Sequence, residues 1–127
     1  MTAPHLHTVR VYYEDTDFSG AVYHASYLRF MERARTEMLR ARGVSQGQVA
    51  FGFVVRSLAI DYLKPARMDD LLNIETTVEK IGGATLDLVQ RVLRGAERLT
   101  EARVRVACVV NSRPVRIPTH VLEQLRA

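Results

Sequence analysis

Apolar and polar residues alternate along residues 7–14, HTVRVYYE. Val9 and Val11 fall on one face of this segment, and Arg10 falls on the other. A repeat of two residues is typical of a β-strand that buries one face and exposes the other. The pattern therefore predicts a first strand that runs into the acidic stretch EDTD.

In residues 24–42 the apolar residues recur every three or four positions instead of every two. Apolar residues recur there at helical spacing: Tyr27, Met31, Ala34, Met38 and Ala41. Charged residues occupy the other sides of the segment, as in an amphipathic helix. Gly43 follows, and glycine is the residue that commonly ends a helix. The pattern predicts one long helix with an apolar side that must be buried.

The rest of the chain consists mainly of apolar segments separated by turn residues. Four further strands are predicted, at residues 54–63, 71–81, 85–94 and 102–110.

Turn residues set the limits of these strands. The pair Gly82 and Gly83 and the segment 95–98 are typical of hairpin turns. Pro65 excludes a central strand at its position, because proline has no N–H to donate to a neighbour. A short helix is predicted at 118–125. The last three strands should therefore form an antiparallel meander.

An antiparallel sheet can bury one face only if another element covers it. The helix at 24–42 is the one predicted element with enough apolar surface to do so. We therefore expect an α+β fold, in which an antiparallel sheet of about five strands wraps around one long central helix.

The composition is that of an ordinary globular protein, with 47% hydrophobic and 25% charged residues. A chain of 127 residues fits one domain, so residues 1–127 are expected to form a single domain. No apolar run approaches the roughly 20 residues of a membrane helix. The start MTAPHLHTVRV lacks the features of a secretory signal. These observations predict a cytoplasmic protein without a membrane span.

The 18 basic and 14 acidic residues give a net charge of +4. The basic residues are spread along the chain, which favours an anionic partner only weakly. A phosphate-bearing small molecule fits that charge, and no motif of a nucleic-acid-binding protein is present. The single cysteine, Cys108, lies in the apolar stretch VRVACVV, which predicts a buried thiol and not a nucleophile.

Three carboxylates crowd the turn before the long helix: Glu14, Asp15 and Asp17. Like charges so close raise one another's pKa unless cations or hydrogen-bond donors intervene. One of them is therefore a candidate base. The first N–H groups of the helix that follows have no intrahelical partner and lie at the positive end of the helix dipole. They can hold an oxygen atom that becomes negative.

A carboxylate beside such N–H groups suits acyl transfer, and thioester hydrolysis in particular. The carboxylate activates water or attacks the carbonyl carbon, and the N–H groups stabilise the oxyanion. A thiolate leaves without a proton, so the absence of a Ser-His-Asp or Cys-His pattern does not exclude hydrolysis. Asp, Ser and Gly are also the usual residues of turns and helix caps, so the pattern alone leaves a purely structural role open.

The stretch VRVYYEDTDFSGAVYHASYLRFMERARTEMLR, residues 9–40, closely resembles the hotdog-fold acyl-CoA thioesterases of the 4-hydroxybenzoyl-CoA thioesterase family. The resemblance is to the bacterial Tol-Pal-associated branch in particular. It extends over nearly the whole chain and includes FVVRSLAIDYLKPARMDDLLNIET, the GGATL hairpin and RPVRIP. It implies a hotdog fold and hydrolysis of acyl-CoA to a free acid and coenzyme A.

The resemblance also implies roles for single residues. Asp17 corresponds to the catalytic carboxylate, as base or nucleophile. His24 corresponds to the residue at the helix start whose backbone N–H meets the thioester oxygen, and its imidazole is a candidate for orienting the substrate. Asp15 and Glu14 match the family pattern without an assigned chemistry, so we interpret them as turn-forming or charge-tuning groups.

Further residues are candidates for substrate binding. Tyr23 directly precedes His24 in the chain. Glu32 matches a helix position at which an acid meets the substrate hydroxyl in the hydroxybenzoyl branch, with a structural ion pair as the alternative. Lys64, Arg67 and Arg113 are candidates for the phosphates of coenzyme A, and each is otherwise a solvated charge.

Residues 18–20, Phe-Ser-Gly, depart from the small-Gly-Gly run that is usual in this branch. Phe18 is expected either to narrow the acyl pocket or to pack at a subunit contact.

The resemblance implies a homodimer or homotetramer with active sites at the subunit interface, and acyl carrier protein is a further candidate partner. No metal or redox cofactor is expected, because His5 and His7 lack a third ligand at suitable spacing. Two alternatives remain open. One is a hotdog hydratase acting on enoyl or hydroxyacyl thioesters, although its G-D-x-N-P-x-H pattern is absent. The other is a noncatalytic module that binds acyl-CoA or acyl carrier protein.

Overall fold

The structure is a computed structural model that describes residues 3–44 and 51–126. Its described elements are, in chain order, β1 (His5–Arg10), the 3₁₀ helix η1 (Tyr13–Asp15), α1 (His24–Ala41), β2 (Gly52–Tyr62), β3 (Leu71–Ile81), β4 (Thr85–Arg94), β5 (Glu97–Val110), β6 (Arg113–Pro114) and α2 (Thr119–Arg126).

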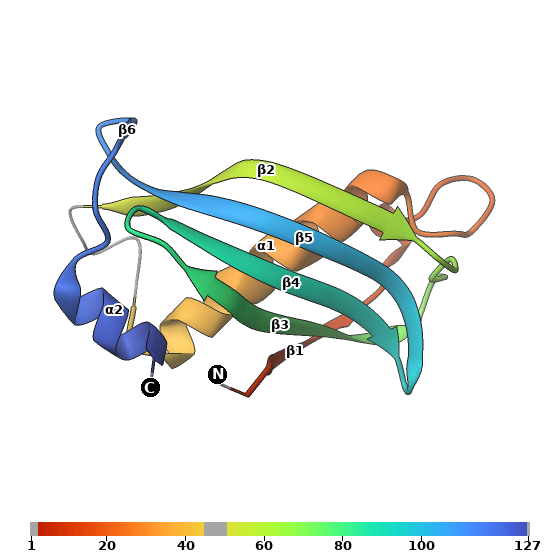
Figure 1. Ribbon diagram of the computed structural model, residues 1–127. Helices are drawn as coiled ribbons and strands as arrows, with labels where there is room; N and C mark the ends of the chain where they lie inside the picture. Colours follow the sequence, from red (N-terminus) through yellow and green to blue (C-terminus); the bar gives the residue numbers. More distant parts are fainter. Residues whose placement is uncertain (1–2, 45–50, 127) are drawn as a thin grey trace.

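The strands form one antiparallel sheet in the order β1-β3-β4-β5-β2, with the two-residue strand β6 paired to β5 (Figure 1). The meander β3-β4-β5 is confirmed, as are an antiparallel sheet of about five long strands and both predicted helices. The order leaves β1 and β2 at the two edges of the sheet. Of these, β2 is the longer, with 11 residues against six.

The predicted end of the long helix is confirmed at Gly43. This residue has a φ of +81°, a left-handed conformation that glycine adopts without strain. The N–H of Gly43 donates to the carbonyl of Arg40, and the N–H of Val44 donates to the carbonyl of Leu39. These two bonds satisfy carbonyl groups that the end of a helix otherwise leaves open.

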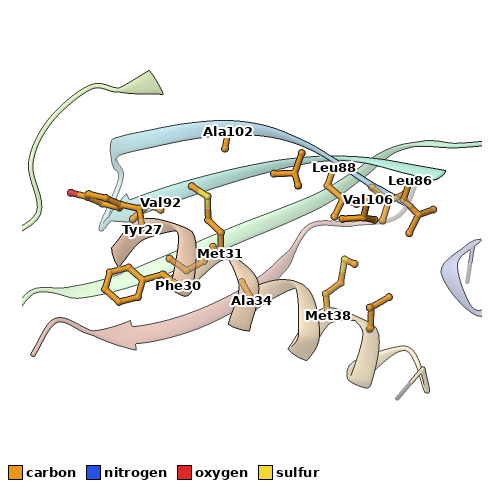
Figure 2. Close-up of a cluster of buried hydrophobic side chains, with 14 of the residues drawn as sticks. Tyr27, Phe30, Met31, Ala34, Met38, Leu86, Leu88, Val92, Ala102 and Val106 are labelled. Carbon is orange, nitrogen blue, oxygen red and sulfur yellow. The ribbon is translucent and has the colours of Figure 1, made fainter. Parts of the chain in front are cut away.

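The apolar side of α1 packs against one face of the sheet. Figure 2 shows side chains of α1 pointing toward side chains of β4 and β5. The buried residues on the helix side include Tyr27, Phe30, Met31, Ala34 and Met38. Those on the sheet side include Leu86, Leu88, Val92, Ala102 and Val106. Burial of this cluster fixes the position of α1, and therefore the place where the helix begins.

Most predicted strand limits lie within two residues of the observed ones, and two are wrong by more. The first strand ends at Arg10 and not at residue 14, because the Tyr12 N–H donates to the side chain of Asp15 at 2.9 Å instead of to a neighbouring strand. The last long strand begins at Glu97 and not at residue 102, because the turn after Arg94 occupies only two residues.

The loop that joins β1 to α1 lies at the end of the sheet where β2 finishes (Figure 1). It is tied there by an isolated bridge between Ala21 and Arg67 and by the Val22 N–H, which donates to the Ala66 carbonyl at 2.8 Å. The acidic turn and the start of α1 are therefore held against the segment that follows β2.

Candidate active site

The loop before α1 is a closed turn that presents Asp17. Thr16 and Val22 form an isolated antiparallel bridge at its base. Inside it, the Asp17 N–H donates to the Ala21 carbonyl at 2.9 Å, and the Gly20 N–H donates to the Asp17 carbonyl at 3.0 Å. Gly20 has a φ of +85°, which favours glycine at this point of the turn.

Asp15 connects this turn to the start of the helix. Its side chain is buried and accepts the Tyr12 N–H, with the guanidinium of Arg29 at 3.8 Å. Its backbone oxygen accepts the N–H of Tyr23 at 2.9 Å and the hydroxyl of Ser26 at 3.1 Å. Asp15 is therefore a structural residue, and its carboxylate is occupied within the chain.

Asp17 is exposed, and its carboxylate is held ionised. The Oδ1 oxygen accepts both the hydroxyl of Ser19 and the Ser19 N–H, the latter at 2.8 Å. The Ser19 hydroxyl, then its amide, hold the pKa of Asp17 below the ordinary aspartate value, with smaller contributions from the amide of Ala21 and the charge of Arg67. Asp17 thus meets the stated exception to the effect of crowding, because hydrogen-bond donors intervene and its pKa is lowered.

The start of α1 offers peptide N–H groups without acceptors. Tyr23 is the N-cap residue, and its side chain does not cap the helix. The Ser26 N–H donates to the Tyr23 carbonyl at 2.8 Å. Within residues 3–44 and 51–126, no acceptor is found for the N–H groups of His24 and Ala25. These two groups carry the positive end of the helix dipole.

A cavity of about 400 Å³ lies at this end of the helix and is lined by both Asp17 and His24. Its lining residues are Asp17, Val22, Tyr23, His24, Tyr27, Tyr62, Leu63, Lys64 and Pro65. The carboxylate predicted as catalytic and the residue predicted to supply the oxyanion donor therefore share one cavity.

Aromatic rings form much of the cavity wall. The His24 ring lies 4.4 Å from the ring of Tyr23 and 6.3 Å from that of Tyr62, measured between centroids. The Tyr62 hydroxyl donates to the His24 carbonyl at 2.9 Å. The Tyr27 hydroxyl accepts the Ala66 N–H at 3.0 Å. Burial raises the pKa of both tyrosines, so both hydroxyls stay protonated at neutral pH.

Three of the predicted binding residues lie outside this cavity: Arg67, Glu32 and Arg113. Arg67 adjoins the loop through its bridge to Ala21 but does not line the cavity. Glu32 lines a second cavity of about 340 Å³ between α1 and strands β2, β4 and β5. Arg113 is on β6, which Figure 1 shows at the opposite end of the sheet from the loop.

Lys64 does line the cavity, but its charge is already engaged. Its ammonium group forms an ion pair with Glu97 at 3.0 Å. Phe18 is fully exposed, at 106% of its reference area, and is absent from the cavity lining. It therefore does not narrow the cavity of the single chain, and its packing at a subunit contact stays a prediction.

Sequence reasoning missed three residues of the site: Ser19, Tyr27 and Tyr62. Ser19 lay within the stretch that departs from the family pattern, which was a usable indication. The helical spacing indicates only that Tyr27 belongs to the apolar side of the helix, and it does not predict the contact of its hydroxyl. Tyr62 is 38 positions beyond His24, and no local pattern connects the two.

The described residues contain neither a candidate membrane-spanning helix nor a candidate metal site. No helix among them is both long and apolar enough to cross a membrane. No group of three or more His, Cys, Asp or Glu side chains in residues 3–44 and 51–126 is arranged to hold a metal ion.

Comparison with known proteins places the chain in a family. The model of the thioesterase-like superfamily matches residues 11–125. The chain belongs to this superfamily. Its fold is accordingly the hotdog-like fold of thioesterases, with an antiparallel sheet of five to six strands and helices.

Close relatives support this membership over most of the chain. The acyl-CoA thioesterase YbgC of Haemophilus influenzae is 50% identical over 119 residues, which cover 89% of this chain and 88% of the relative. The acyl-CoA thioester hydrolase YbgC of Escherichia coli O157:H7 is 44% identical over 124 residues, covering 93% and 92%. The crystal structure of a probable thioesterase from Bartonella henselae has a TM-score of 0.88 at 40% identity, covering 91% and 100%.

The hydrogen bond from Tyr62 to the first residue of α1 gives a stability prediction. Tyr62→Phe removes the donor to the His24 carbonyl and should lower the free energy of unfolding by about 0.5–1.5 kcal/mol. Tyr13→Phe is the matched control, because the Tyr13 side chain is 78% exposed and its hydroxyl has no partner among the described residues. Urea denaturation of both variants measures the difference. Equal unfolding free energies for the two variants would show that the Tyr62 bond does not anchor the helix start.

Proposed function

We propose that the protein hydrolyses acyl-CoA thioesters to a free acid and coenzyme A. The observation that carries this proposal is the shared cavity, which is lined by the ionised Asp17 and by His24, the first residue of α1, whose N–H has no acceptor among the described residues. The names of the YbgC relatives support the same reaction and the same substrate class. No metal or cofactor is required for this chemistry.

In the proposed reaction the thioester oxygen lies at the start of α1 and accepts the His24 N–H. Acting as general base, Asp17 takes a proton from water, and the water oxygen bonds to the carbonyl carbon. The electron pair of the carbonyl moves to its oxygen, where the helix N–H groups stabilise the charge. The electron pair then returns from the oxygen, the carbon–sulfur bond breaks, and the thiolate of coenzyme A leaves. Asp17 gives its proton back to the thiolate or to solvent, and the acid is released.

Asp17 can also act as the nucleophile. In that route its free oxygen bonds to the carbonyl carbon, the thiolate leaves, and water hydrolyses the mixed anhydride. The exposure of Asp17 and its lowered pKa are compatible with both routes. Oxygen-18 incorporation into the enzyme during a single turnover distinguishes them.

The remaining candidates are proposed to bind parts of the substrate. Tyr23 and the imidazole of His24 line the cavity beside the reacting carbonyl. Lys64 is the best placed of the candidate phosphate ligands, and it would exchange Glu97 for a phosphate of coenzyme A. Arg67, next to the loop, would add to the positive field there. Arg113 lies at the far end of the sheet from the loop, so it is not proposed as a ligand for the site of its own chain.

We propose that the chain assembles at least as a homodimer through the β2 edge. This edge strand exposes apolar side chains along its length: Val54, Val55, Leu58 and Tyr62. A long apolar edge is a template for pairing with another strand. In an antiparallel β2 pair, the Tyr62 end of one chain lies beside the Val54 end of its partner. The second cavity, with Glu32, would then adjoin the partner's Asp17 site, and α1 would act as the single central helix of each subunit.

A hydratase and a noncatalytic binder are the alternatives. A hydratase would change the enoyl absorbance of its substrate without releasing thiol. A binder of acyl-CoA or acyl carrier protein would retain its function after loss of the Asp17 charge. The family membership supports neither alternative over hydrolysis.

Replacement of one carboxylate tests the proposed reaction. Asp17→Asn should lower the rate of thiol release from acyl-CoA by roughly 10²- to 10⁴-fold, because the amide cannot take a proton from water. Binding of acyl-CoA should be largely kept. Glu14→Gln is the matched control, since Glu14 is exposed in the same turn and makes no hydrogen bond or ion pair among the described residues. Turnover by Asp17→Asn equal to that of Glu14→Gln would eliminate the mechanism.

Charges on the two edge strands test the proposed dimer. Leu58→Lys places a charge on the β2 edge and should weaken dimerisation by roughly 100-fold or more. Leu6→Lys is the control, because Leu6 is 58% exposed on β1 at the opposite edge. Light scattering should show Leu58→Lys at the chain mass of 14.4 kDa and Leu6→Lys at twice that mass or more. Dissociation by Leu6→Lys alone would place the interface on β1 instead.

A further inference from the structure

We propose that Ser19 is a positioning residue for Asp17, which holds the Oδ1 oxygen of the carboxylate so that the Oδ2 oxygen meets the water or the thioester. This inference rests on the proposed function, because it assigns a task to a second residue of the same site. It goes beyond that function by naming which oxygen reacts and what fixes it.

The contact geometry is the first support. Ser19 donates twice to the same atom, once from its backbone N–H at 2.8 Å and once from its hydroxyl. Neither bond ends on Oδ2. The terminal torsion angle of an aspartate side chain normally has a broad distribution. Two donors on one oxygen restrict that angle. The two oxygens therefore become inequivalent, although the side chain is exposed.

The loop that carries Ser19 is itself fixed, which makes the contact a preformed one. The backbone between Asp17 and Ala21 is closed by two internal hydrogen bonds. Ala21 is joined to Arg67 by a bridge at the other side of the loop. The Phe18 side chain points into solvent and does not compete for the carboxylate. Preorganised donors of this kind cost no rearrangement when the substrate binds.

The contact with Ser19 lowers the pKa of Asp17, and this effect can be measured. The Ser19 hydroxyl is the largest cause of the lowered pKa of Asp17, ahead of the Ser19 amide. Lowering that pKa keeps the carboxylate ionised, and so able to take a proton, down to more acidic pH. Loss of the hydroxyl should move the pKa up toward the ordinary aspartate value. The acid limb of the pH profile of kcat/KM should then move to higher pH.

The test compares three variants of the 127-residue chain and uses a fourth to assign the NMR signal. Ser19→Ala removes the hydroxyl and keeps the amide donor, whereas Ser19→Thr keeps both. Thr16→Val is the control, because the Thr16 hydroxyl donates to the Tyr13 carbonyl in the same turn and does not contact Asp17. The Asp17 carboxyl is titrated by NMR with carbon-13-labelled aspartate, and the Asp17→Asn variant assigns its resonance.

We expect the NMR titration midpoint and the acid limb of kcat/KM to move up together in Ser19→Ala, and to stay near the wild-type values in Ser19→Thr and Thr16→Val. On the plateau of the profile, kcat/KM should fall by less than about tenfold, because the Ser19 amide still holds Oδ1.

Two contrary results have different meanings. An unchanged NMR midpoint in Ser19→Ala, or an equal shift in Thr16→Val, would overturn the role of Ser19 whatever the enzyme hydrolyses. A shifted NMR midpoint with an unmoved acid limb would confirm that Ser19 holds the carboxylate and would overturn Asp17 as the reacting group. The failure of this inference and the failure of the proposed function are therefore distinguishable.

Discussion

The peptide N–H groups at the start of α1 are the feature on which the rest of the site depends. A helix start normally satisfies these groups with a capping side chain or with water. Here the backbone of Asp15 accepts the Tyr23 N–H and the Ser26 hydroxyl, which fixes the chain on both sides of His24. Within residues 3–44 and 51–126 the N–H groups of His24 and Ala25 have no acceptor, and His24 lines the cavity. Burial of the apolar side of α1 against the sheet keeps this helix start in place.

The two aspartates of the turn lie in different environments and therefore have different roles. Asp15 is buried, binds a backbone N–H and lies near Arg29, so its carboxylate helps to build the turn. Asp17 is only two positions away, yet it is exposed and is held ionised by Ser19. The acidic cluster is therefore not a set of equivalent charges. One member supports the helix start, and another is free to react beside it.

The sequence predicted the elements whose patterns are long. The limits of α1 followed from 18 residues of helical spacing and from Gly43, and the meander followed from its turns. The end of β1 was not predictable from alternation, because a single side chain, that of Asp15, captures the Tyr12 N–H and ends the pairing.

The candidate site was predictable where neighbours in the chain are neighbours in space. Asp17 and His24 flank one loop, so their shared cavity followed from the motif and the family resemblance. Glu32 was harder to place, because eight residues of helix span about 12 Å and carry it to a second cavity. The separation of Arg113 from the site depends on the path of β6, and no local pattern reports that path.

The central claim is that the start of α1 binds the thioester oxygen while Asp17 faces the carbonyl carbon. The most direct measurement is a crystal structure of the protein with an acyl-CoA analogue in which a methylene group replaces the thioester sulfur. The account predicts the carbonyl oxygen at about 3 Å from the His24 nitrogen, with the Asp17 Oδ2 oxygen, or a water bound to it, facing the carbonyl carbon. A carbonyl oxygen bound elsewhere, with the His24 N–H donating to a group of the protein, would contradict it.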